Sequence, residues 1–399
     1  MNFSTTFDFE KHINRIILFM LVIFFISEVA TKLAYRFDLA FHNYSALVKG
    51  FFAISILIYS ILNRNYYIKK VLFFLSLIMI IFISGQYVFN SYSFGEHFFE
   101  NFITLSRYVF VFILSLCFFR VEIQISNRVF YVFEKIIILN SLLIIIGALF
   151  EISFFETYTT RFGYNGFFMT PSTGTYFYAL ALTYFSYKYF YNGEKLLELL
   201  LVLLVCFLVG TKALLLFLAL TALHLFVSKK LYKIKLLYIF AGSLLILFIT
   251  FKLEIKNYLI TKFDILFNLY NEQGLITMLT SMRDMNFKED FIPLVTEKWN
   301  WLNFLFGGTD FEIYRVEFEI FDVFLFFGFV GSALYLWNYF DKIIIFKKLD
   351  TFEKLQLFFL LFVALLSGNF FNNAPVSLYL LLVLSFFYSK NHADSNVEK

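Results

Sequence analysis

Apolar residues gather in twelve runs of about 16 to 24 residues, separated by short polar segments. A helix needs about 20 apolar residues to cross a bilayer. The pattern therefore predicts an all-α integral membrane protein with about twelve transmembrane helices. The first run is expected to remain in the membrane as the first span, without a cleavable signal. The runs lie at approximately 15–34, 44–62, 70–90, 101–119, 129–151, 172–190, 195–210, 212–228, 233–252, 317–340, 354–370 and 374–389.

The seventh and eighth runs are short and meet at Gly210-Thr211-Lys212. We expect two helices joined by a tight turn, and a re-entrant pair is the alternative. The whole chain, residues 1–399, is expected to form one polytopic membrane domain.

Lysine and arginine residues alternate between the connections, as the positive-inside rule requires of a correctly counted bundle. Residues 91–100 carry Glu96 and Glu100 but no basic residue, whereas every second connection is basic. Both termini are therefore predicted to be cytoplasmic. The basic residues of the predicted inside segments are Lys11, Arg15, Arg64, Lys69, Lys70, Arg120, Arg128, Lys135, Lys188, Lys195, Lys229, Lys230, Lys233, Lys235, Lys342, Lys347, Lys348, Lys354, Lys390 and Lys399.

Two predicted outer segments stand out, residues 153–171 and residues 253–316. The second is the only long hydrophilic stretch, and its apolar residues recur every three or four positions. This pattern is typical of amphipathic helices on a membrane surface. We therefore expect a large outer loop with such helices, anchored at the interface by Trp299 and Trp301.

Composition supports the membrane interpretation, because 60% of the residues are hydrophobic and only 16% are charged. A soluble domain is typically about 45–50% apolar and about 25% charged. The composition excludes a soluble enzyme, a disordered chain and a disulfide scaffold. The net charge of +4 is assigned to the inside loops, so no nucleic-acid partner is expected.

Three basic residues in outer positions are candidates for binding phosphate. Lys212 lies between two apolar runs, Arg161 begins RFGYNG and is followed by Gly163 and Gly166, and Arg283 lies in TSMRD. Each also has a purely structural interpretation. Lys212 can extend its ammonium to the interface, Arg161 can be solvated, and Arg283 can pair with Asp284 or a neighbouring acid.

The segment 310–322 carries the strongest local charge pattern. On a helix, Glu312, Arg315, Glu319 and Asp322 share one face, whereas Glu317 lies off it. Acidic residues are favourable at the start of a helix, which accounts for Glu317 and Glu319. Asp322 is expected about one turn deeper, where it needs a partner or a water-filled cavity.

Arg107, Glu134 and Glu28 lie within predicted spans and are interpreted as structural, with Glu134 near the inner interface. The five histidines show no spacing typical of a metal site. No P-loop or dinucleotide-binding pattern occurs. We therefore expect neither a metal nor a cofactor, and the energy for any reaction must come from the substrate.

Three stretches in order resemble the bacterial O-antigen and capsule repeat-unit polymerases of the Wzy type, which share their layout with the O-antigen ligases. They are RFGYNGFFMTPSTGTYFYALAL (161–182), FLVGTKALLLFLAL (207–220), and SMRD (281–284) with NFLFGGTDFEIYRVEFEIFDVFLFFGFVGSALYL (303–336). Related proteins often have Asn where this chain has Ser172-Thr173. Ligases tend to carry a His in the large outer loop, and residues 253–316 contain none.

The resemblance implies a GT-C-like bundle in the bacterial inner membrane and a metal-independent, nucleotide-independent glycosyltransferase. The substrate would be an undecaprenyl-diphosphate-linked oligosaccharide, whose growing glycan is transferred to an incoming lipid-linked unit. Membrane lipid and a chain-length regulator are the other partners implied. The residues expected to bind the diphosphate are Arg283, Lys212, Arg161 and Arg315, and the candidate general bases, with the choice left open, are Asp322, Glu319 and Glu317.

Two alternatives to the polymerase remain. A ligase would transfer finished polymer to the lipid A core. A lipid-linked oligosaccharide flippase would have a similar number of spans, but such transporters are built from two related halves. The long hydrophilic loop occurs once, late in the chain, and gives no sign of such symmetry.

Overall fold

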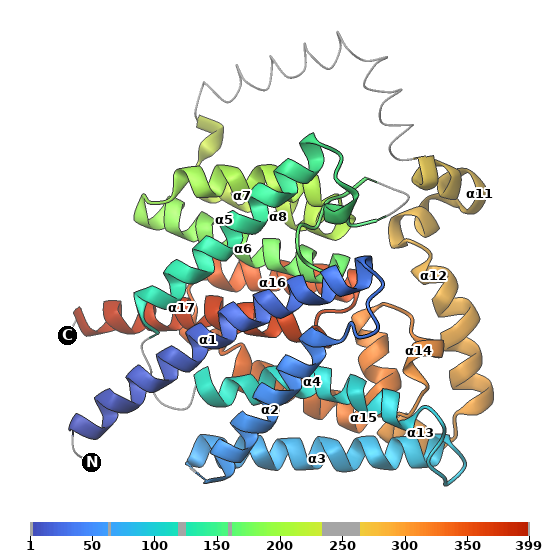
Figure 1. Cartoon of the computed structure of the whole chain (residues 1–399). Helices are drawn as coiled ribbons and strands as arrows, with labels where there is room; N and C mark the ends of the chain where they lie inside the picture. Colours follow the sequence, from blue (N-terminus) through green and yellow to red (C-terminus); the bar gives the residue numbers. More distant parts are fainter. Residues whose placement is uncertain (1–2, 63–64, 119–124, 159–161, 234–263, 398–399) are drawn as a thin grey trace.

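The computed structural model describes residues 3–62, 65–118, 125–158, 162–233 and 264–397 (Figure 1). Within these ranges the chain is helical apart from its connections, and one isolated bridge pairs Glu156 with Tyr164. The all-α prediction is confirmed for this part of the chain. The longer helices are α1 (Phe3–Arg36), α2 (Tyr44–Leu62), α3 (Tyr66–Phe89), α4 (Phe98–Phe118), α5 (Asn127–Leu149), α6 (Pro171–Asn192), α7 (Leu196–Val209), α8 (Lys212–Ser228), α11 (Asp264–Thr280), α15 (Glu319–Asn338), α16 (Thr351–Ser367) and α17 (Ala374–Val397).

Eleven of the twelve apolar runs coincide with these helices, and the run 233–252 falls almost wholly outside the described residues. Within the described part, six helical stretches are long and apolar enough to cross a membrane. Such helices are those of an integral membrane protein, and the count of twelve crossings remains a prediction. The six stretches are His12–Arg36, Tyr44–Leu62, Tyr66–Phe89, Phe98–Phe118, Asn127–Leu149 and Glu319–Lys348.

Large apolar side chains cover the outside of these helices. Phe51 of α2 is 68% exposed and Phe73 of α3 is 71% exposed. Water would not tolerate a surface of this kind over whole helices, whereas lipid covers it at no cost. The expected turn between the two short runs is also present, because α7 ends at Val209 and α8 begins at Lys212.

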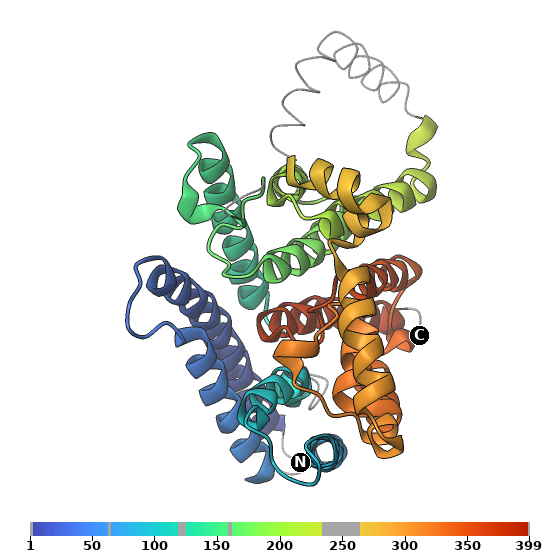
Figure 2. The same cartoon turned by 90° about the vertical axis from the view of Figure 1, so that its right-hand side faces the viewer.

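The two ends of the helix bundle differ in what they carry. Helix α1 begins and α17 ends at the left of Figure 1, and we call this side the termini end. The segment from α11 through α12 (Arg283–Asn286), α13 (Trp301–Phe306) and α14 (Phe311–Tyr314) lies at the right, which we call the loop end. Figure 2 looks onto the loop end, where this gold segment crosses in front of the orange and red helices.

Helix α6 lies inside the bundle, between α7, α8 and α17. Every residue from Thr173 to Tyr187 is buried. A helix that is buried all round shows no single apolar stripe. The four tyrosines in this stretch fill the interior with large side chains, which explains why α6 is less hydrophobic than the helices around it.

The predicted role of Trp299 as an interface anchor is wrong. Its side chain is only 8% exposed and packs with Leu294, Val316 and Leu325. Its indole Nε1 donates a hydrogen bond to the Gly308 carbonyl at 3.1 Å. A tryptophan whose N–H has a buried partner gains more from the interior than from an interface. Trp301, in contrast, is 69% exposed.

Glycines allow α3, α13 and α15 to approach each other at backbone distance. Gly328 interrupts α15 with φ 65° and ψ −170°, a conformation that is almost restricted to glycine. A Cβ atom there would lie 2.4 Å from the Gly307 nitrogen. At Gly85 of α3, a Cβ atom would lie 2.4 Å from the Phe306 carbonyl oxygen. This contact fixes the segment before α15 against the bundle.

We predict that Gly328→Ala destabilises the protein by about 1–3 kcal/mol, since the substitution adds both backbone strain and a clash. Thermal unfolding of the purified protein in detergent measures the effect. Gly50→Ala in α2 is the control, because a Cβ atom at that position meets nothing within 4 Å. Equal unfolding temperatures for the two variants would contradict the close approach.

Candidate functional site

Residues 315–322 do not form the continuous helix that the charge spacing predicted. Helix α14 ends at Tyr314, Glu317 has a φ of 64°, and α15 begins at Glu319. The prediction that Glu312, Arg315, Glu319 and Asp322 share one helical face is therefore wrong. The chain turns here because a carboxylate of the next helix binds its backbone amides.

That carboxylate is Asp322, in the first turn of α15. Its Oδ1 accepts hydrogen bonds from the backbone N–H groups of Val316 at 2.9 Å and Glu317 at 3.2 Å. Its Oδ2 lies 3.9 Å from Arg315 Nε. The side chain is almost fully buried. Asp322 thus has the partners that a charge at this depth requires, and it holds the turn before α15.

Glu319 makes a similar contact with another part of the chain. Its two carboxylate oxygens accept hydrogen bonds from the backbone N–H groups of Phe370 and Phe371, each at 2.8 Å. These amides belong to the turn between α16 and α17. Glu319 is also almost fully buried, so both of its oxygens are occupied by structural contacts.

Glu317 differs from these two acids because its side chain is 39% exposed. Two arginines reach it. Arg283 Nη2 lies 3.3 Å from Oε2, and Arg315 Nη2 lies 3.6 Å from Oε1. Arg315 Nη2 also donates to Asn369 Oδ1. The structure therefore brings together two arginines that are 32 positions apart, on the one of the three candidate acids that solvent can reach.

The Nε groups of Arg283 and Arg315 have no hydrogen-bond partner among the described residues. A guanidinium has five N–H donors in a planar fork, which suits the oxygens of phosphate groups. Each arginine therefore has a buried N–H group that makes no hydrogen bond within the described part of the chain.

The turn before α12 fixes the position of Arg283. Ser281 and Met282 have left-handed backbone conformations, with φ values of 57° and 70°. Lys212 holds the same turn, because its Nζ donates to Ser281 Oγ at 3.0 Å and to the Met278 carbonyl. The lysine that sequence analysis assigned to phosphate thus lies beside the Arg283 turn and contacts protein there.

Asp284 stabilises this turn from the other side. Its carboxylate accepts hydrogen bonds from the hydroxyls of Thr277 at 2.8 Å and Thr280 at 2.7 Å. Burial acts to raise the pKa of Asp284, but the hydrogen bonds from Thr280 and Thr277 outweigh it and lower the pKa below its ordinary value. Arg283 therefore pairs with an acid, as its structural interpretation expects, but the acid is Glu317 rather than Asp284.

Helices α6, α8 and α17 all begin near this cluster. The hydroxyl of Thr175 in α6 lies 2.8 Å from that of Thr211, which precedes α8. Thr173 donates to Asn373, the residue before α17, at 3.3 Å. Helix N-termini carry partial positive charge, so their convergence favours an anion.

Sequence reasoning missed Asn369, Asn373 and Tyr176. The Tyr176 hydroxyl donates to the Gly368 carbonyl at 2.5 Å, next to Asn369. The local signal for the two asparagines is a polar interruption, GNFFNN (368–373), between the last two apolar runs. No charge marks this segment, which is why it was not singled out.

Arg161 lies outside the described residues. The chain after it packs on the end of α7, where the Tyr164 N–H donates to the Leu208 carbonyl at 2.8 Å. Lys32 of α1 holds the same loop through the Gly166 carbonyl at 2.6 Å. The residues after Arg161 are therefore anchored at Leu208, which precedes Lys212 by four positions in the chain.

The remaining candidates have contacts that account for them. Glu28 pairs with Lys49 at 2.6 Å. Glu134 is 5% exposed, and it pairs with Lys188 and Lys195. Arg107 of α4 lies within electrostatic range of the acid Glu312 as well as of Arg315. In the described part of the chain, no group of three His, Cys, Asp or Glu side chains could hold a metal ion.

Comparison with known proteins adds no relative to this description. The sequence matches no family model, and neither a curated protein nor a solved structure is significantly similar to it. The arguments below therefore rest on the residues and their geometry.

We predict that Glu319→Gln lowers the stability by about 1–3 kcal/mol, because the amide NH₂ of glutamine cannot accept one of the two backbone N–H groups. Glu317→Gln, which involves no backbone partner, is the matched control and should unfold near the wild-type temperature. Thermal unfolding in detergent distinguishes them. If Glu317→Gln were the more damaging variant, the structural role of Glu319 would be wrong.

Proposed function

We propose that this protein is a glycosyltransferase that polymerises lipid-linked repeat units of a bacterial surface polysaccharide. The growing glycan is carried on undecaprenyl diphosphate and is transferred to a sugar hydroxyl of an incoming lipid-linked unit. In this proposal the loop end faces outward from the inner membrane, and both termini are cytoplasmic. The support from sequence is the resemblance of residues 161–182, 207–220 and 281–336 to Wzy-type polymerases.

The convergence of Arg283 and Arg315 on Glu317 is the observation that carries the proposal. A diphosphate leaving group needs cations, and arginine binds phosphate oxygens through two parallel hydrogen bonds. In the protein without substrate, Glu317 occupies part of this donor set. A bound diphosphate would compete for the two guanidiniums and leave the carboxylate beside the reacting groups.

Glu317 is then the best candidate for the general base among the three acids. The oxygens of Glu319 are occupied by backbone amides, as is Oδ1 of Asp322. In the proposed step, the acceptor hydroxyl loses its proton to Glu317 while its oxygen forms a bond to the sugar C1 atom. The bond between C1 and the diphosphate oxygen breaks, and undecaprenyl diphosphate leaves with the electron pair.

Lys212 has a positioning role in this scheme, since it holds the turn before Arg283. The N-termini of α6, α8 and α17 add positive potential to the same end of the bundle. Because cleavage of the diphosphate linkage supplies the driving force, the reaction requires no nucleotide.

We predict that Arg283→Ala abolishes chain growth, with a rate loss of roughly 10²–10³-fold, as expected when a cation that stabilises the leaving group is removed. Protein reconstituted in vesicles is supplied with lipid-linked oligosaccharide. The oligosaccharide is extracted from cells that lack this protein. Products are then separated on a gel. Wild-type protein should give a ladder, and Arg283→Ala should leave single units.

Lys288→Ala, which removes a nearby positive charge of the same segment, is the matched control and should retain the ladder. A normal ladder from Arg283→Ala would refute the assignment of Arg283. Wild-type protein that moved units across the membrane without joining them would instead favour the flippase.

We also predict that Glu317→Gln lowers the polymerisation rate by about 10²–10⁴-fold, the usual contribution of a general base. The amide retains the size of the side chain but cannot take the proton. Glu312→Gln, an exposed acid of the same segment, should retain activity. The same gel assay, run as a time course, measures both rates. Equal rates for Glu317→Gln and wild type would remove Glu317 as the base.

A further inference from the structure

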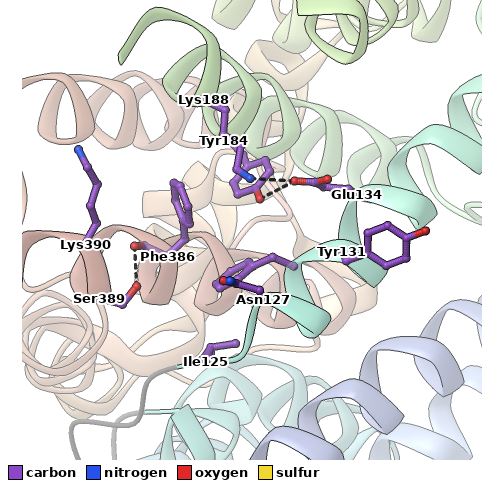
Figure 3. A pocket seen from close by; sticks show the side chains of 10 residues that line it. Ile125, Asn127, Tyr131, Glu134, Tyr184, Lys188, Phe386, Ser389 and Lys390 are labelled. Atoms are coloured by element: carbon purple, nitrogen blue, oxygen red, sulfur yellow. Dashed lines mark hydrogen bonds and ion pairs between the residues drawn. The ribbon is translucent and has the colours of Figure 1, made fainter. Parts of the chain in front are cut away.

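A second charged site lies at the termini end, far from the cluster just described. A pocket of about 530 Å³ opens between the start of α5, the end of α6 and the end of α17. Its lining includes the basic residues Lys188 and Lys390 and the neutral polar residues Ser389 and Asn127. Figure 3 shows Glu134 joined to Tyr184 and Lys188, with Lys390 on the other side of Phe386. Nothing in the proposed polymerase reaction uses this pocket.

The acid in the pocket is already compensated. Glu134 Oε1 accepts a hydrogen bond from the Tyr184 hydroxyl at 2.8 Å and lies 3.1 Å from Lys188 Nζ. Glu134 Oε2 lies 3.0 Å from Lys195 Nζ, which also pairs with Glu198 at 3.1 Å. Two ammonium groups and two carboxylates therefore pair here, and Lys390 of the lining adds a positive charge that forms no part of these pairs.

Further cations surround the opening. Lys390 Nζ lies 4.4 Å from the ring centroid of Tyr187. Lys135 Nζ lies 5.1 Å from the ring of Tyr131, which lines the pocket. Arg128 is exposed beside Asn127. The field at the mouth of the pocket thus favours an anion.

Aromatic walls give the pocket an apolar side. Phe130, Tyr184 and Phe386 pack against each other, with ring centroids 4.9 to 6.4 Å apart. A soluble anion needs no apolar wall, whereas a lipid presents an acyl-glycerol part directly beside its phosphate. Basic pockets between membrane helices are suited to such head groups.

We propose that this pocket binds the phosphate head group of an anionic phospholipid, with Lys188 and Lys390 contacting the phosphate and Phe130 and Phe386 contacting the glycerol region. The ligand chemistry is a phosphate diester, and the membrane is its source. Binding there joins the ends of α5, α6 and α17, which otherwise meet through side chains alone.

Native mass spectrometry of the purified protein in detergent tests the proposal. Phosphatidylglycerol should bind more tightly than phosphatidylcholine with the same acyl chains. Lys390→Gln should weaken phosphatidylglycerol binding about fivefold, the effect expected for one lysine near an anionic head group. The double variant Glu134→Gln/Lys188→Gln removes both partners of an ion pair. It therefore leaves no acid without a compensating base. It should weaken binding similarly.

Lys70→Gln is the matched control. Lys70 lies at the same end of the bundle, on α3, with its Nζ also 4.4 Å from a tyrosine ring, that of Tyr66. This variant should bind phosphatidylglycerol as the wild type does. Equal affinity for the two lipids, or an equal effect of Lys390→Gln and Lys70→Gln, would overturn the proposal. Full displacement of the lipid by an equal concentration of inorganic phosphate would also overturn it, since the site would then take free phosphate.

Discussion

Two buried carboxylates at the start of α15 hold the loop end of this protein together. Asp322 binds the amides of the turn before α15, and Glu319 binds the amides of the turn between α16 and α17. A buried charge without partners costs several kcal/mol in a low-dielectric surrounding. Four backbone N–H groups and Arg315 supply those partners, so the acids make stable what would otherwise be two irregular loops beside a membrane.

The same arrangement separates the acids by role. With Glu319 and Asp322 occupied, Glu317 is the acid that remains accessible, and its left-handed backbone directs it out of the turn. Arg283 reaches it from a different segment, whose turn is held by Lys212 and Asp284. The proposed chemistry therefore depends on structural contacts made by residues that look catalytic by type. Removing them would disturb activity through position rather than through proton transfer.

Charge is scarce in this chain, and it is concentrated at the two ends of the bundle. At the loop end, two arginines meet an exposed carboxylate. At the termini end, lysines outnumber acids around a pocket with aromatic walls. In our proposals both sites bind phosphate oxygens, but the rest of the ligand differs: the first binds a lipid-linked sugar beside the exposed Glu317, and the second binds a lipid through its apolar side.

The sequence by itself determined the helices, because a run of about 20 apolar residues has few alternatives to a helix in lipid. It also determined which ionisable residues needed an explanation, and Arg283, Arg315 and Glu317 were among them. Only the tertiary structure decided which acid is exposed, where the helix 310–322 breaks, and that Trp299 is buried. The reason is that these outcomes depend on hydrogen bonds between residues up to 52 positions apart, whereas helical periodicity reports only neighbours within one or two turns.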